Sequence, residues 1–197
     1  MKCNSATRLL SGLALAATLA STAAIAAPAA VVVVAPGSSW EYSGVATPGW
    51  NTTTGGWSVG AAPFGNTSGG DFGANTNWSA NTLLWVRKAV DFTGFNTATA
   101  HWDLGVDNGF DLYVNGTHIA GANAEGFTSR WEYSGALGGL HSGVNIIAVA
   151  LEDHGGATAF DMQILAAPVP EPETYAMMLA GLGLLGLAAR RRQAKQK

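Results

Sequence analysis

The stretch TAHWDLGVDNGFDLYVNGTHIAG, residues 99–121, alternates apolar and polar side chains around two turn sequences. Side chains of a strand alternate between its two faces, so the pattern predicts three antiparallel strands joined by tight turns. A three-residue loop at 107–109 places Val106 opposite Phe110, whereas a two-residue loop would pair Val106 with Asp111 and mix the faces. The first register also gives two further apolar pairs: Leu104 with Leu112, and Trp102 with Val114.

The second turn, Asn115–Gly116, is typical of a type I′ hairpin turn, because Asn and Gly both tolerate positive φ. It places Leu112 opposite Ile119, so the apolar face continues onto a third strand. In the first turn, we expect Gly109 to supply the positive φ that such loops commonly need. The stretch therefore predicts a meander with one buried face.

Further strands are predicted on both sides of the meander. Residues 83–92 alternate, but Lys88 interrupts the apolar face, which favours an edge strand or a bend. Residues 144–151 are almost all apolar, as in a central strand covered on both faces, and residues 159–165 alternate again. Residues 30–35 are either a first strand or the start of the mature chain. Short strands separated by turn residues predict an all-β fold, a β-sandwich or jelly roll.

The segment from Pro28 to Pro168 is acidic and has the length of one domain. It contains three basic residues against eleven acidic ones, a net charge of −8 that the basic ends of the chain conceal. An acidic surface repels phosphate backbones, which argues against nucleic acid as a partner. The one cysteine, Cys3, precedes this segment, so no disulfide supports the domain.

Both ends of the chain carry targeting patterns. A basic start and an alanine-rich apolar run end in Ala24-Ile25-Ala26, as in a secretory signal peptide, so residues 1–26 are predicted to form a signal helix that is removed. A retained membrane anchor is the alternative. Near the other end, residues 175–189 are apolar and Arg190, Arg191 and Arg192 follow. As a transmembrane helix this run would reach about 22 Å, short of a comfortable crossing, with the arginines on the cytoplasmic side.

The segment Val169, Pro170, Glu171 and Pro172, together with this run and the arginines, closely resembles the PEP-CTERM sorting signal of Gram-negative bacteria. The resemblance covers residues 169 to 192 and leaves 27–168 as the domain and 169–197 as the sorting region. It implies an exosortase-like protease as partner, transient residence in the inner membrane, and delivery to the surface or exopolysaccharide matrix. An ordinary C-terminal anchor is the alternative.

The middle of the chain resembles a second family through four segments that occur in order: residues 57–65, 87–92, 107–116 and 143–149. Together they resemble the galactose-binding-like jelly roll that is often appended to glycoside hydrolases, over residues 40–165. The resemblance implies a β-sandwich scaffold, many members of which bind no sugar.

The ionisable residues indicate neither catalysis nor a defined metal site. His101, His118, His141 and His154 have no metal-ligand spacing, and a turn explains the adjacent Glu152 and Asp153. We therefore expect no enzyme activity and no cofactor. Oxygen ligands for a structural calcium ion are abundant, but they follow no known spacing. The weak candidates are Asp71, Asp107, Asn108, Asp111 and Asp161.

Binding is the remaining class of function. Sugar rings stack their C–H faces on Trp and Tyr while polar side chains bond the hydroxyls, and loops on a rigid sandwich commonly carry such residues. The candidates in or beside loops are Trp50, Trp78, Asn123, Glu125, Arg130, Trp131 and Tyr133, whereas Trp85 and Trp102 are predicted to be core. Each loop tryptophan has the alternative role of closing an end of the sandwich. The leading hypothesis is an exported, non-catalytic glycan-binding protein. A structural surface protein with protein partners, and a small hydrolase, are the alternatives.

Overall fold

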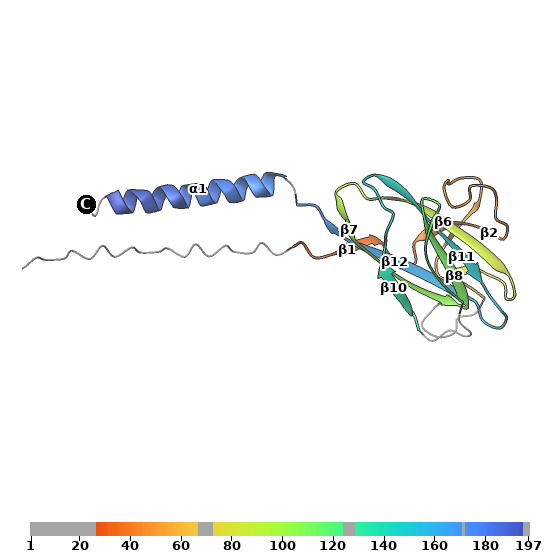
Figure 1. The fold of residues 1–197 in the computed structure, drawn as a ribbon. Coiled ribbons are helices and arrows are strands. Elements are labelled where there is room, and N and C mark those ends of the chain that lie inside the picture. Colours follow the sequence, from red (N-terminus) through yellow and green to blue (C-terminus); the bar gives the residue numbers. More distant parts are fainter. Residues whose placement is uncertain (1–26, 67–72, 124–128, 171, 195–197) are drawn as a thin grey trace, which may run out of the picture.

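The computed structural model describes residues 27–66, 73–123, 129–170 and 172–194. Within these residues the chain forms two six-stranded sheets and one C-terminal helix. Figure 1 shows the two sheets packed face to face. The predicted all-β sandwich is therefore confirmed.

The first sheet has the order β10-β7-β12-β4-β5, and β1 also pairs with β12. Its strands are β1 (Val31–Val34), β4 (Phe64–Gly65), β5 (Thr76–Asn77), β7 (Phe95–Asp107), β10 (Tyr133–Ala136) and β12 (Ala159–Pro168). The second sheet has the order β3-β2-β6-β11-β8-β9. Its strands are β2 (Ser39–Ser43), β3 (Ser58–Ala61), β6 (Leu83–Asp91), β8 (Gly109–Val114), β9 (Thr117–Asn123) and β11 (Val144–Glu152).

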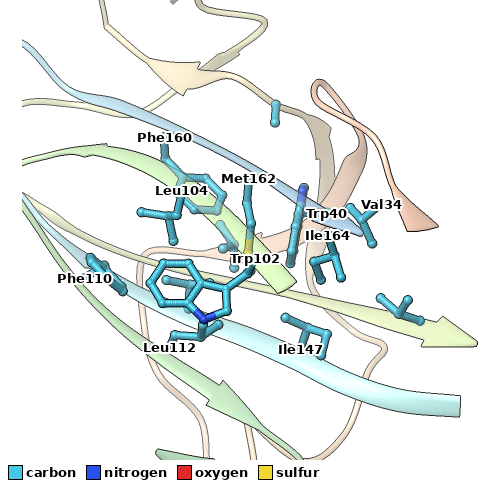
Figure 2. Close-up of a cluster of buried hydrophobic side chains, with 14 of the residues drawn as sticks. Val34, Trp40, Trp102, Leu104, Phe110, Leu112, Ile147, Phe160, Met162 and Ile164 are labelled. Carbon is cyan, nitrogen blue, oxygen red and sulfur yellow. The ribbon is translucent and has the colours of Figure 1, made fainter. Parts of the chain in front are cut away.

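The core lies between the inner faces of the two sheets. Figure 2 shows Trp102 and Met162 of the first sheet directed toward Leu112 and Ile147 of the second. All four side chains are buried, and so are the other inward positions of β7, β8, β11 and β12. Removal of this apolar surface from water is the main stabilising contribution to a domain without disulfides.

The predicted first hairpin of the meander is wrong. Strand β7 pairs with β10 and β12, whereas β8 pairs with β9 and β11, so Asn108, between the end of β7 and the start of β8, carries the chain from one sheet to the other. Gly109 does not adopt a positive φ. The predicted buried face is nevertheless correct. A hairpin and a crossing between sheets bury the same alternate residues, so periodicity cannot distinguish them.

The second hairpin is confirmed. Asn115 and Gly116 have φ values of 50° and 83° and connect the paired strands β8 and β9. An irregularity between Leu112 and Tyr113 shifts the register by one residue, so Leu112 lies opposite Ala120 rather than Ile119.

The two long strands of the second sheet are both internal. Strand β11 lies between β6 and β8, as predicted for a central strand, but β6 lies between β2 and β11 and is not an edge. Lys88 is accommodated there because its Nζ donates to the carbonyl of Ser39 at 2.8 Å. Its partial burial lowers the pKa of Lys88 from the ordinary value.

Helix α1 (Pro172–Ala194) contains the apolar run predicted at residues 175–189. In the described part of the chain, no helix combines the length and the apolar character needed to cross a membrane. The predicted signal helix, residues 1–26, lies outside the described residues.

Candidate functional site

One half of the outer face of the second sheet is covered by residues 44–57, which connect β2 to β3. The covered half centres on Arg87 of β6, which is only 2% exposed. Its Nε donates to Glu41 Oε2 at 2.8 Å, and its two terminal nitrogens donate to the carbonyls of Trp50 and Gly55 at 3.2 and 2.6 Å. Glu41 in turn accepts from the backbone N–H of Gly55. This network satisfies the buried charges and holds the loop against the sheet.

Aromatic contacts hold the same loop in place. The Arg87 guanidinium lies 4.0 Å from the centre of the Trp57 ring, a cation–π contact. Trp57 is stacked with Trp50 at 6.4 Å, and Trp50 meets the ring of Tyr113 edge-on at 5.4 Å. Trp50, predicted to bind ligand, therefore fixes the loop and borders the uncovered half of the face.

The uncovered half forms a groove of about 480 Å³. One row of paired residues crosses β6, β11, β8 and β9. In this row Trp85 lies opposite Ala150, Ala150 opposite Asp111, and Asp111 opposite Gly121. A parallel row contains Leu83, Glu152, Gly109 and Asn123. The small Ala150 leaves a hollow between Trp85 and Asp111. We call this hollow the groove; its principal side chains are Leu83, Trp85, Asp111, His118, Asn123 and Glu152.

Histidines orient the two carboxylates of the groove. His118 Nε2 lies 2.8 Å from Asp111 Oδ1, and His154 Nε2 lies 3.1 Å from Glu152 Oε1. A Cβ on Gly121 would collide with Asp111 Oδ1 and come within 3.3 Å of His118 Nε2. Glycine at position 121 is therefore required for this carboxylate–imidazole arrangement.

The predicted ligand residues separate into different environments. Asn123 lines the groove. Trp78 does not face a ligand, because it is 2% exposed and its Nε1 donates to the Thr82 carbonyl at 3.2 Å within the core region. Glu125 lies outside the described residues.

Tyr133 is the first residue of β10 in the first sheet, and Arg130 and Trp131 precede it in the chain. Arg130 forms an ion pair with the fully buried Asp161 and contacts the Trp131 ring at 5.2 Å. Tyr133 packs on Phe110 at 5.1 Å. Burial raises the pKa of Tyr133, and the charge of Glu132 raises it further. Arg130 and Tyr133 therefore make contacts within the protein, and ligand binding by this group stays a prediction.

Four groove residues have other roles in the prediction from sequence: Trp85, Asp111, His118 and Glu152. Trp85 was predicted to be core, yet it is only half-buried and faces outward. The outward direction of Trp85 could be predicted from the alternation of its strand. Leu84 and Val86 both face inward, so position 85 points to the opposite face.

The calcium candidates that lie in the described residues do not converge on one point. Asp161 accepts from the backbone N–H groups of Gly37 and Met162 in addition to pairing with Arg130, while Asp111 pairs with His118. Asp71 lies outside the described residues. Among the residues that the structure describes, no group of three or more His, Cys, Asp or Glu side chains is arranged to hold a metal ion.

Asp107 makes the stability of the fold depend on pH. Burial raises the pKa of Asp107, and the nearby charges of Asp153 and Glu132 raise it further. The protonated group therefore stabilises the fold, and this contribution is lost as the pH rises through the folded-state value. We expect Asp107→Asn to raise the melting temperature at neutral pH, with the gain shrinking as the pH falls toward the ordinary value of 3.8.

Thermal unfolding across this pH range tests the expectation. Asp91→Asn is the control, because a hydrogen bond from the Thr93 backbone lowers the pKa of Asp91 and predicts the opposite sign. A gain for Asp107→Asn that is the same at every pH would contradict the assignment.

Residues 56–60, Gly-Trp-Ser-Val-Gly, match the G-x-S-x-G pattern of hydrolase nucleophile elbows. In such enzymes the serine occupies a tight turn from a strand to a helix. Here Ser58 begins strand β3, which pairs with β2. The match therefore lacks the structural context that gives the motif its chemistry.

Comparison with known proteins confirms the sorting signal and the fold. Residues 168–192 match the PEP-CTERM protein-sorting motif. The motif supports an exported, sorted surface protein and implies a membrane-anchored precursor that an exosortase processes. No curated protein matches the sequence.

Among solved structures, a beta-glucuronidase from an uncultured Clostridium species aligns with 73% of this chain at 8% identity and a TM-score of 0.51. A beta-glucuronidase from Lactobacillus rhamnosus aligns with 73% of the chain at 10% identity and a TM-score of 0.49. The chain spans 30% and 29% of those proteins. The likeness to the Clostridium protein supports the β-sandwich and extends to the fold alone.

Proposed function

We propose that this protein is an exported, non-catalytic surface or matrix protein that binds glycan in the groove. The observation that carries the proposal is the outward-facing Trp85, separated from Asp111 only by the small side chain of Ala150. An aromatic face next to polar side chains is the combination that a sugar ring requires, because its C–H face is apolar and its edge carries hydroxyls.

The lining of the groove suits both the apolar C–H face and the hydroxyl-bearing edge of a sugar ring. The indole of Trp85 offers a rigid apolar surface at low conformational cost. Asp111, Glu152 and Asn123 offer oxygens that accept hydrogen bonds from hydroxyls. Few polar groups converging on an aromatic surface are typical of small-molecule sites.

The sorting motif supplies the biological context. A protein released at the cell surface is placed among exported polysaccharides, so exopolysaccharide is the ligand class to test first. The groove also contains two carboxylates, the residue type that glycosidases use in pairs, so hydrolysis is measured in the same samples.

Trp85→Ala is expected to lower the affinity for glycan at least tenfold, because the stacking surface is lost while the backbone of β6 is unchanged. Binding is measured by screening the purified protein on a glycan array and titrating the strongest ligands. Circular dichroism verifies that the variant remains folded.

Trp131→Ala is the matched control. It removes a tryptophan that is among the ligand residues predicted from sequence but lies outside the groove, and it should leave glycan affinity unchanged. Loss of binding in Trp131→Ala but not in Trp85→Ala would reject the groove as the site. Absence of binding to any glycan would favour a structural protein with protein partners, and release of reducing sugar ends would favour a hydrolase.

A further inference from the structure

The groove carries negative charge and lacks strongly basic side chains. Asp111 and Glu152 line it, together with His118. The three basic residues between Pro28 and Pro168 are engaged elsewhere: Arg87 with Glu41, Arg130 with Asp161, and Lys88 with the Ser39 carbonyl. Within the described residues, no Lys or Arg lines the groove.

Within the described residues, a histidine contacts one oxygen of each of the two carboxylates in the groove. His118 Nε2 lies against Asp111 Oδ1, and His154 Nε2 lies against Glu152 Oε1. In the part of the chain that the structure describes, the second oxygen of each carboxylate has no hydrogen-bond donor, and the two side chains are 55% and 47% exposed. Both oxygens are therefore accessible to a donor that a ligand brings.

We propose that the groove selects amino sugars, whose ammonium group binds the free oxygens of Asp111 and Glu152 while the ring stacks on Trp85. This inference rests on the proposed function and names its ligand class. An ammonium group donates up to three hydrogen bonds, and bonds between ionised partners are about twice as strong as neutral ones.

The same charges exclude anionic sugars. A uronic acid or a sulfated sugar would bring its negative charge beside two carboxylates with no Lys or Arg to pair with. The surrounding field acts in the same direction, because the segment from Pro28 to Pro168 carries a net charge of −8. Like charges at a binding surface suppress the wrong ligand and slow its approach.

Two hexasaccharides that differ at the amino group provide the test: one of glucosamine, which carries ammonium groups, and one of N-acetylglucosamine, in which uncharged acetamido groups take their place. Calorimetric titration of the full chain, purified in detergent micelles, is carried out at a pH at which the ligand amines are protonated. We expect the glucosamine chain to bind about tenfold more tightly, or about 1.4 kcal/mol. Added salt should reduce this difference, and a galacturonic acid hexasaccharide should not bind.

Asp111→Asn and Glu152→Gln should each bring the ratio of the two affinities closer to one, because each removes a charge while keeping an oxygen acceptor. Asp91→Asn is the matched control. It removes the same charge from the opposite end of β6 and should leave the ratio unchanged.

Equal affinity of the wild-type protein for both hexasaccharides would overturn the amino-sugar inference and leave glycan binding intact. A ratio that falls equally in Asp91→Asn would assign the preference to the overall charge and overturn the role of the groove. Failure of the protein to bind any glycan on the array would instead remove the proposed function itself.

Discussion

Leu112→Asp is expected to unfold the β-sandwich. Leu112 is 0% exposed, lies on β8 opposite Val149 of β11, and faces the core that Figure 2 shows. A carboxylate at this position has no partner. Burial of an unpaired polar or charged group costs several kcal/mol, and a domain of this size is stable by only about 5–15 kcal/mol. Far-UV circular dichroism and thermal unfolding should show loss of the cooperative transition.

Tyr113→Ser, one residue along, is the control for this prediction. Tyr113 faces outward, where it contacts Trp50 and His118 at the edge of the groove. Its loss should cost about 1–2 kcal/mol, within the range of an ordinary substitution, and the variant should remain folded. Equal destabilisation by the two substitutions would mean that β8 does not present one face to the core.

The hairpin at Asn115–Gly116 was predictable because its determinant is local. Two adjacent residues that both accept positive φ specify the turn, and the turn specifies which strands pair. Residues 107–109 look similar in sequence, but there the chain crosses between sheets. Whether such a link closes a hairpin depends on pairing with β10, β11 and β12, which lie far along the chain. Local pattern therefore identified the buried face and missed the partner strands.

The groove was not predictable as a site because the register of strand pairing in the second sheet brings its residues together. Trp85, Ala150, Asp111 and Gly121 come from four strands that are distant in sequence, and pairing alone brings them into one row. No local sequence pattern predicts that residues 44–57 fold back over Arg87 and leave only half of the outer face of the second sheet uncovered. The outward phase of Trp85 was the one usable signal, and it follows directly from the inward phase of Leu84 and Val86.

The sorting motif adjoins the sandwich without a linker. Strand β12 remains paired up to Pro168, which lies opposite Phe95, and the N–H of Val169 donates to the Gly94 carbonyl at 2.8 Å. Helix α1 begins at Pro172, and proline is favoured at the first position of a helix because that N–H needs no partner. Only residues 169–171 separate the last strand from the helix, so a protease that cuts there works at the edge of the folded domain.

Replacement of Pro170, Glu171 and Pro172 by alanine is therefore expected to leave essentially all of the protein as the membrane-associated precursor. The change removes the residues for which the motif is named and lets the backbone of this short segment leave the conformation that proline imposes. Immunoblots of membrane and surface fractions, with mass spectrometry of the C-terminus, measure the outcome. Gln193→Ala with Lys195→Ala, outside the matched residues 168–192, should be processed normally. A wild-type protein recovered from the surface with Lys197 intact would show that sorting does not involve cleavage.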